Sequence, residues 1–253
     1  MNTYKTSEIA RCIGVHPNTV RLYEELALIP EPERKANGYR IFTDFHMEQM
    51  KLARTALQVE VLQNGLRKQS IAIIKTSASG DFDKAIGLTK QYLQQIENEQ
   101  KNAEEAIIIA EKLLSGNGQE IDNTALTRKE AASYLQITMD ALRNWEMNGL
   151  LTVKRKQNGY RIYNQEDVRR LKVIRSLRCA NYSLSAILRM LNTLSYNPGA
   201  NIRQAIDTPK ENDDIISVCD KLLTSLHYAE NNAQAMLSQL KKMKKQFGTN
   251  PPF

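Results

Sequence analysis

Residues 37–42 read Asn-Gly-Tyr-Arg-Ile-Phe, and residues 158–163 read Asn-Gly-Tyr-Arg-Ile-Tyr. An Asn-Gly pair between two short extended segments is the strongest local signal for a β-hairpin. The two stretches stand 121 residues apart, and Lys35 and Lys156 keep the same spacing. A repeat at this distance indicates that one structural unit occurs twice in the chain.

The repeat extends to the N-terminal side of each hairpin. With one residue of slack, Arg21-Leu22-Tyr23-Glu24 aligns with Arg143-Asn144-Trp145-Glu146. With the same slack, Leu28-Ile29 aligns with Leu150-Leu151. A single loop deletion explains the change of spacing, so the repeated unit includes everything from these motifs to the hairpin.

A short helix is predicted at the start of each copy. Thr6 and Thr127 are expected to cap it, and Glu130 completes a capping box in the second copy. Gly14 marks the end of the helix in the first copy, because glycine accepts the left-handed conformation that ends many helices. A tight turn follows.

A second helix comes after the turn. In the first copy it begins at Pro17, in the first helical position, and runs to about Leu26. In the second copy it begins after the Thr138 cap and runs to about Met147. The side chains expected to face the core are Val20, Tyr23, Leu142 and Trp145.

Two more helices are predicted after the hairpin of each copy. Thr43 and Asn164 are expected to cap the third helix, with Asp167 reaching back to the cap in the second copy. The fourth begins at Ser183 in the second copy and covers about 66–75 in the first. Helix, turn, helix and hairpin in this order predict a winged helix-turn-helix unit, with the hairpin as the wing.

A long amphipathic helix is predicted after each unit, because apolar residues recur at steps of four and three. In the first copy they are Phe82, Ile86, Thr89, Leu93, Ile96, Gln100, Ala103, Ile107, Ala110 and Leu114. In the second copy they are Ile215, Cys219, Leu222, Leu226, Ala229, Ala233, Met236, Leu240, Met243 and Phe247. The eleven residues of the linker 115–125 span at most ~36 Å, whereas each helix is roughly 50 Å long. Parallel pairing within one chain would require the linker to return the full length of a helix, so antiparallel pairing is expected.

The predicted fold is therefore mainly α, with two winged helix-turn-helix domains, each followed by a long helix, and the two helices pairing as an antiparallel coiled coil. The expected segments are a first DNA-binding domain at 1–80, a first coiled-coil helix at 81–114, a linker at 115–125, a second DNA-binding domain at 126–205, and a second coiled-coil helix and tail at 206–253.

Positive charge is concentrated in the two repeated units. The chain has a formal net charge of +7. The segments 1–80, 81–120, 121–205 and 206–253 carry about +3, −4, +8 and 0. This distribution assigns the excess to the repeated unit and favours a polyanionic partner for it.

Several other classes of protein are disfavoured. Cys12, Cys179 and Cys219 are an odd number at no metal-ligand spacing, which predicts free thiols and no metal. No stretch approaches the ~18 apolar residues of a membrane span and the start does not resemble a signal peptide, so a cytoplasmic protein is expected. The histidines are scattered and no nucleophile has a base beside it, so neither an enzyme nor a cofactor is expected.

A helix-turn-helix unit reads DNA bases with side chains near the start of its second helix, while other groups grip phosphates. The candidate readers are His16, Asn18, Thr19 and Arg21 in the first copy, and Thr138, Asp140 and Arg143 in the second. The candidate wing residues are Tyr39, Arg40, Lys154, Lys156, Tyr160 and Arg161. Tyr23 and Trp145 are DNA-contact candidates too, weighed against a role in core packing.

These motifs, in this order, make the chain resemble the mercury-resistance regulator (MerR) family. The resemblance covers both copies and implies an antiparallel dimer that presents two winged units to successive major grooves of promoter DNA. It also implies distortion of the promoter so that RNA polymerase engages. This chain departs from the pattern by carrying both units itself, which predicts an intramolecular pseudo-dimer with unlike heads and an imperfect palindromic site.

Two other functions are compatible with these residues. An architectural protein, such as a recombination directionality factor, also bends DNA with winged units. A protein-interaction scaffold built on the long helices would bind no DNA. If a small-molecule effector exists, it is expected to bind between the helices, where the irregular segment 196–214 either lines a pocket or serves as a connector.

Overall fold

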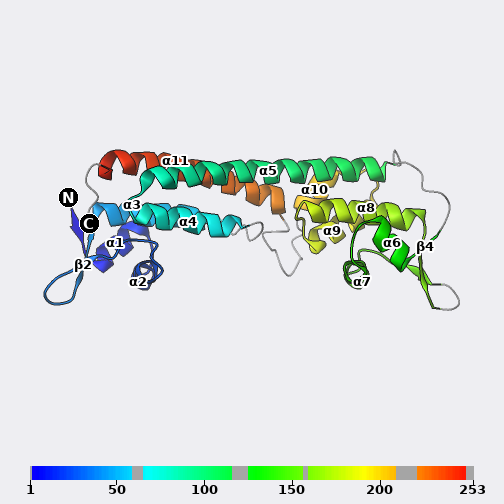
Figure 1. Cartoon of the computed structure of the whole chain (residues 1–253), viewed down its shortest axis with the longest axis horizontal. Coiled ribbons are helices and arrows are strands. Elements are labelled where there is room, and N and C mark those ends of the chain that lie inside the picture. The colour runs from blue at the N-terminus through cyan, green and yellow to red at the C-terminus, as the bar shows by residue number, and fades with distance from the viewer. Residues whose placement is uncertain (1, 59–64, 116–124, 156–158, 209–220, 249–253) are drawn as a thin grey trace. The chain divides into compact units, whose positions relative to one another are not determined.

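The computed structural model describes residues 2–58, 65–115, 125–155, 159–208 and 221–248, and it is mainly helical, as predicted. The chain divides into two compact units. Unit 1 comprises Met1–Asn98 and Leu226–Phe253, and unit 2 comprises Glu99–Ser225. Each unit contains one winged helix-turn-helix head, whose helices are labelled in Figure 1.

The first head is built from helices packed on a small antiparallel sheet with strand order β1-β3-β2. Thr3 pairs with Thr43 and Arg34 with Arg40, so the hairpin predicted at Asn37-Gly38 is confirmed. The elements of unit 1 are β1 Thr3–Tyr4, α1 Thr6–Ile13, α2 Pro17–Glu25, β2 Glu33–Arg34, β3 Arg40–Thr43, α3 Asp44–Leu57 and α4 Leu66–Ala78, with the first half of α5 (Phe82–Leu114) and most of α11 (Leu222–Phe247).

The second head repeats this plan with strand order β4-β6-β5. Thr127 of β4 pairs with Ile162 of β6, and Arg155 pairs with Arg161 across the second wing. The elements of unit 2 are β4 Leu126–Thr127, α6 Arg128–Tyr134, α7 Met139–Met147, β5 Lys154–Arg155, β6 Arg161–Tyr163, α8 Gln165–Cys179, α9 Leu184–Tyr196 and α10 Ile202–Asp207, with the second half of α5 and the start of α11.

Helix caps confirm most of the predicted boundaries. Asn164 Oδ1 accepts a hydrogen bond from the Asp167 N–H at 2.8 Å, and the Asp167 carboxylate accepts one from the Asn164 N–H at 3.0 Å. Thr127, Thr138 and Ser183 cap α6, α7 and α9 with their side-chain oxygens. Thr43 is the N-cap of α3, and Gly14 ends α1 in the left-handed conformation.

The predicted cap at Thr6 is wrong by one residue. Lys5 is the N-cap of α1, and its backbone N–H donates to Glu8 Oε2 at 2.7 Å. The reason is that Glu8 stands three residues after Lys5, where a glutamate satisfies the free N–H of the residue before the helix. Thr6 is therefore the first residue inside the helix.

Each head holds the exit of its second helix with a side chain from the helix after the wing. Gln49 of α3 is buried, and its Nε2 donates to the Leu28 carbonyl at 3.0 Å and to the Ile74 carbonyl at 2.8 Å. At the corresponding place in α8, Arg170 Nε donates to the Leu150 carbonyl at 2.6 Å. A buried carbonyl without a partner is costly, so both copies supply a donor there.

The long helices bury one seam each, with a correction to the first. The eight positions predicted in α11, from Leu222 to Phe247, are all buried, whereas Ile215 and Cys219 lie outside the described residues. In α5 six of the predicted positions are buried, namely Phe82, Thr89, Ile96, Ala103, Ile107 and Ala110, and so are Ala85, Tyr92 and Ala106. Of the other predicted positions, Ile86, Leu93 and Gln100 are half-buried and Leu114 is exposed. The step of four and three is therefore right but starts with three, because Ala85 and Tyr92 complete the heptad.

Within unit 1, the last turns of α11 lie beside the first turn of α5. Lys244 Nζ is 2.5 Å from Asp83 Oδ1, and the Phe247 ring packs edge-on against Phe45, which also contacts Phe82. These contacts have the antiparallel direction that was predicted for the two helices. The pairing of the two helices along their whole length as a coiled coil stays a prediction.

The region between α9 and α11 differs from its prediction. The predicted second helix was drawn from residue 206, but residues 206 and 207 end α10, and α11 begins at Leu222. The segment 196–214, offered as a pocket lining, contains α10 and lies outside the described residues from 209 onward. In the part of the chain that the structure describes, no helix has the length and apolar character needed to cross a membrane.

Candidate nucleic-acid interface

The start of α2 exposes the predicted base readers of the first head. His16 is the N-cap, and its Nδ1 accepts a hydrogen bond from the Asn18 N–H at 3.2 Å. Asn18 and Arg21 are exposed, and Arg21 Nη1 donates to Asn18 Oδ1 at 3.2 Å. The cap occupies one ring nitrogen of His16, so only the other is available to a partner. Thr19 is half-buried beside them.

The start of α7 presents a different set in the second head. The Thr138 hydroxyl oxygen is used as the cap and accepts from the Ala141 N–H at 3.0 Å. Asp140 and Arg143 are exposed, as are Met139 and Met147, which the sequence prediction did not include. The two helices therefore share an arginine at the equivalent place but differ in charge and polarity around it.

The aromatic candidates in these helices face the core. Trp145 is 6% exposed, so its ring cannot stack on a base, and it is a correction to the predicted contact set. Tyr23 is half-buried and packs against the core formed by Ile9, Val20, Phe42 and their neighbours. Burial raises the pKa of the Tyr23 hydroxyl above its ordinary value. Both rings therefore pack against the core of their head.

The wing tips carry the exposed aromatic residues. Tyr39 and Tyr160 are each 72% exposed and stand at matching positions just past the Asn-Gly turn. Lys154 is exposed on β5, whereas Lys156 lies outside the described residues. An exposed tyrosine beside an arginine suits contact with a phosphate and sugar, because its ring is apolar and its hydroxyl is polar.

The wing arginines bind a glutamate of the second helix, a contact that the sequence prediction missed. In the first head, Arg40 Nε is 2.6 Å from Glu24 Oε2, and Arg34 Nη2 is 3.3 Å from Glu24 Oε1. In the second head, Arg161 Nε is 2.6 Å and Arg128 Nη2 is 2.9 Å from Glu146 Oε2. The available signal was the glutamate present in both copies of the repeat.

These ion pairs change the role assigned to Arg40 and Arg161. Each arginine holds the wing to the second helix through Nε, so it has a structural role and only its remaining N–H groups are available to a DNA phosphate. The glutamates are largely buried, with side chains 10% exposed at Glu24 and 9% at Glu146. The geometry fixes the wing relative to the reading helix in each head.

The second head adds a tyrosine to this cluster. The Tyr163 hydroxyl donates to Glu146 Oε1, whereas the first head has Phe42 at the same position. Burial, together with the hydrogen bond to the carboxylate, raises the pKa of Tyr163 to about 12. The phenol therefore stays protonated as a donor over the whole neutral range.

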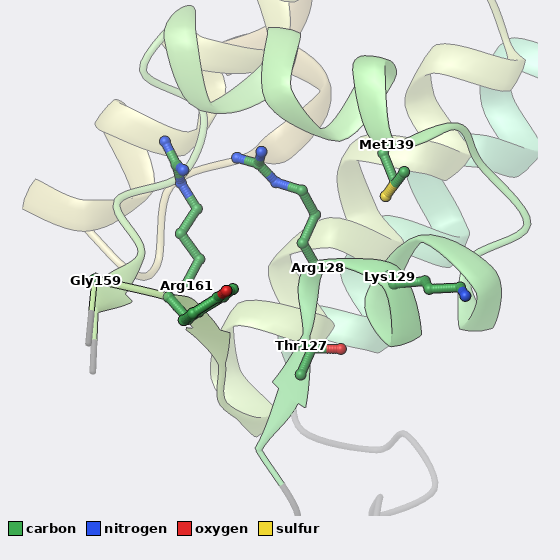
Figure 2. A pocket seen from close by; sticks show the side chains of 7 residues that line it. Thr127, Arg128, Lys129, Met139, Gly159 and Arg161 are labelled. Atoms are coloured by element: carbon green, nitrogen blue, oxygen red, sulfur yellow. The ribbon is translucent and has the colours of Figure 1, made fainter. Parts of the chain in front are cut away.

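A hollow of about 410 Å³ lies between the second wing and the first turns of α6 and α7. Figure 2 shows the Arg128 and Arg161 side chains extending side by side, with Lys129 and Met139 also on the lining. The other lining residues are Thr127, Gly159 and Tyr160.

In the described ranges, no group of three or more His, Cys, Asp or Glu side chains has a metal-site arrangement. Cys12 and Cys179 are exposed free thiols.

The comparisons with known proteins match both heads. The model of the MerR family regulatory proteins matches residues 5–42, and that of the MerR HTH family regulatory proteins matches residues 126–194. No solved structure matches the chain.

Three relatives illustrate the extent of the similarity. The chain is 40% identical over 53 residues to the HTH-type transcriptional regulator CueR of Escherichia coli, covering 21% of this chain and 39% of that protein. It is 32% identical over 65 residues to the mercuric resistance operon regulatory protein of Bacillus cereus, covering 26% and 49%. It is 32% identical over 115 residues to a probable heavy metal-dependent transcriptional regulator of Haemophilus influenzae, covering 45% and 76%. With a family model on each head and three quarters of the last relative covered, the chain belongs to the MerR family.

Proposed function

We propose that the chain is a sequence-specific regulator of transcription that binds double-stranded DNA through its two heads. The observation that carries the proposal is the presence, in one chain, of two reading helices with exposed polar residues at their starts, each clamped by a glutamate to a basic wing. The names of the relatives, which are transcriptional regulators, support the same function.

The distribution of charge supports a DNA partner. The head-containing segments 1–80 and 121–205 carry about +3 and +8, whereas the remaining segments carry −4 and 0. A protein that neutralises several phosphates loses affinity steeply as salt increases, with a slope of about −0.9 per phosphate on logarithmic axes. We expect this behaviour of the chain, and a binding constant that is insensitive to salt would contradict it.

One chain takes the place of a family dimer in this proposal, and its two heads read unlike half-sites. The exposed residues Asn18 and Asp140 occupy matching positions, and an amide and a carboxylate prefer different base edges. Selection of bound duplexes from random DNA should therefore return an imperfect palindrome. A symmetrised site made from two copies of either half should bind more weakly, and equal binding would contradict the single-chain pseudo-dimer.

Distortion of promoter DNA, so that RNA polymerase engages, is the mechanism that we propose by analogy with the family. Footprinting of the selected sites on the source genome tests it, because a regulator of this kind should protect the spacer between promoter elements. Protection of a recombination attachment site would instead favour an architectural role. A small-molecule effector that binds between the helices belongs to the same proposal, and a change of footprint on its addition is the corresponding measurement.

A further inference from the structure

A hollow of about 360 Å³ lies between the end of α5, the end of α6 and the middle of α8, all within unit 2. Its volume is at the lower end of the range of small-molecule sites. It shares no lining residue with the hollow beside the second wing. The lining consists of Leu113 from α5, Tyr134 from α6 and its C-cap Leu135, and Lys172, Arg175 and Ser176 from α8.

The two cations of this hollow have no carboxylate partner among the residues that the structure describes. Lys172 Nζ lies over the Tyr134 ring, 5.1 Å from its centroid. Arg175 Nη2 donates to Gln136 Oε1 at 3.4 Å, which is a long hydrogen bond to a neutral amide. The hollow therefore carries positive charge that the described part of the fold does not neutralise.

The first head neutralises the corresponding lysine. Lys51 of α3 and Lys172 of α8 stand at the same distance from the N-caps of their helices. Lys51 Nζ is 2.7 Å from Glu48 Oε1. At the position of Glu48 the second head has Arg169, so a third cation replaces the carboxylate.

The first head also engages the corresponding arginine. Arg54, the counterpart of Arg175, donates through Nη1 to the Ile13 carbonyl and, at 3.3 Å, to the Gly14 carbonyl. These two carbonyls end α1. In the second head the arginine reaches the Gln136 side chain instead. The second pair of cations therefore lacks, in the described residues, the partners that the first pair has.

We propose that this hollow binds a small organic carboxylate with an apolar body, and that this ligand is an effector of the second head. The inference rests on the proposed DNA-binding function and assigns a site and a ligand class to its regulation. Arg175 offers planar N–H groups that match the two oxygens of a carboxylate, and Lys172 adds a point charge. Leu113 and the Tyr134 ring provide apolar surface for the body of the ligand.

The hollow is placed to act on the reading helix of the second head. Leu135 ends α6 and begins the turn into α7, whose N-cap is Thr138. Leu113 belongs to the long helix α5. A ligand that contacts these elements and α8 holds the head against the end of α5. It changes the affinity for DNA by as much as it favours one arrangement of these helices over another.

Binding is measured first in the absence of DNA. The whole chain is titrated by calorimetry with acetate, hexanoate and benzoate at constant ionic strength, and with benzamide as the uncharged counterpart of benzoate. We expect saturable binding of hexanoate or benzoate, weaker binding of acetate, and no binding of benzamide. Failure of all three carboxylates to bind overturns the proposal, as does benzamide binding as tight as that of benzoate.

Three variants of α8 locate the site. Lys172→Gln and Arg175→Gln should each raise the dissociation constant of the tightest carboxylate by about tenfold or more, because each removes a charged hydrogen-bond donor. Arg169→Glu gives the second head the carboxylate that pairs with the lysine of the first head, and it should also weaken binding. Trp145 fluorescence shows that the second head of each variant is folded.

Lys51→Gln is the matched control, because it removes the same charge from the corresponding position of the first head. The dissociation constant of the carboxylate should stay unchanged in this variant. A constant that is unchanged in all three variants of α8, or that rises equally in Lys51→Gln, overturns the proposal.

Phosphate is the other anion that these cations suit. Inorganic phosphate binding as tight as that of the best carboxylate overturns the carboxylate assignment. A loss of duplex affinity in Lys172→Gln without any carboxylate present assigns the hollow to the DNA backbone and overturns the effector site.

Regulation is measured on the duplex selected by the wild type. A saturating carboxylate should change the affinity of the wild type for this duplex by at least about fivefold and that of Lys172→Gln by less. An unchanged affinity in the wild type overturns the effector role. If the wild type binds no duplex at all, the proposed function fails, whereas the calorimetry still decides whether the carboxylate site exists.

Discussion

The two heads share a scaffold but lock the wing to the reading helix in different ways. In the first head Glu24 holds Arg34 and Arg40, both from the wing. In the second head Glu146 holds Arg161 from the wing, Arg128 from α6 and the hydroxyl of Tyr163. The second cluster joins the wing and the second helix to the first helix, α6, whereas the first joins only the wing and the second helix, so the same glutamate has a larger structural role in the second copy.

The two heads also place glycine in different turns. Gly14 ends α1 with φ of 70°, and the matching residue after α6 is Gln136 with φ of 52°. After the second helix the assignment is reversed, with Ala27 at φ of 55° and Gly149 at φ of 74°. At these two turns each head therefore has one residue with a side chain in the left-handed region, where glycine is favoured. The backbone therefore follows the same path in both heads, even at the turn where glycine is replaced by another residue.

The two heads therefore share their internal contacts and differ in their exposed residues. The capping residues, the glutamate clamp and the donor to the helix exit recur, sometimes with a changed side chain, as in Gln49 and Arg170. The exposed starts of α2 and α7, and the residues around the second hollow, differ.

Acid should destabilise the first head selectively. His46 lies between Thr43 and two phenylalanine rings, and burial lowers its pKa to about 4, whereas the second head has Asp167 at this position. An unfolded histidine takes up its proton near pH 6.5, so the contribution of His46 is complete above that pH and is lost as the pH falls toward 4. The loss should be on the order of 3 kcal/mol.

Urea unfolding from pH 7 to pH 4 measures this effect. Helical circular dichroism reports both heads, whereas fluorescence of Trp145, the single tryptophan, reports the second. His46→Gln, which keeps a capping acceptor but does not titrate, should remove the selective loss. An equal pH dependence in wild type and variant would contradict the prediction.

Removal of the Glu146 carboxylate should cost more than removal of Glu24. Without it, Arg128 and Arg161 face each other and the Tyr163 hydroxyl loses its acceptor. Breaking a buried ion pair costs about 3–5 kcal/mol, but the arginines here are 27% and 30% exposed, so about 2 kcal/mol is expected for Glu146→Ala. Glu24→Ala should cost about half as much and leave the Trp145 transition in place. Equal losses of unfolding free energy in Glu146→Ala and Glu24→Ala would contradict the larger structural role of Glu146.

The Tyr163 hydroxyl should account for part of that difference. Tyr163→Phe removes a hydrogen bond to a charged carboxylate and should lower the free energy of unfolding by about 1–2 kcal/mol. Because the pKa of Tyr163 is raised to about 12 in the fold, its contribution is present below pH 10 and is lost as the pH rises from 10 to 12. The Phe variant should lack this alkaline loss. Phe42→Tyr, the converse change, tests whether the first head can accept the same donor.

Exchange of the left-handed residues should have the smallest effect, with opposite signs in the two heads. Ala27→Gly relieves a side chain in the left-handed region and should stabilise the first head by at most about 1 kcal/mol. Gly149→Ala should destabilise the second by about the same amount, purely through the backbone, because an added Cβ meets no atom within 4 Å. Thermal unfolding of both variants measures the pair. A common sign would contradict the explanation.

Local sequence patterns were sufficient for most of the elements and their order, although they did not predict α10 or the strands β1 and β4. The Asn-Gly turns, the caps at Thr138, Asn164 and Ser183, and the proline at the start of α2 depend on interactions within a few residues, which a linear sequence displays. The heptad step likewise identified all the buried positions of α11 that the structure describes. The duplication, read from two hexapeptides, located both heads.

The site was predictable only in part. The exposed candidate readers, Asn18, Arg21, Asp140 and Arg143, stand at helix positions that the sequence defines. Trp145 was misplaced because whether an aromatic ring faces the core or solvent at a helix position depends on what packs against that helix. The seam of α5 shifted from Ile86 to Ala85 for the same reason, since both residues are apolar enough to be buried.

Two winged heads and two long helices follow from the amino-acid sequence alone, with most of their boundaries, because turns, caps and periodicity act over short range. The clamping of the wings by Glu24 and Glu146 depends on the packed fold. Those partners are distant along the chain, and a charge finds its counterpart only after the strands and helices have packed.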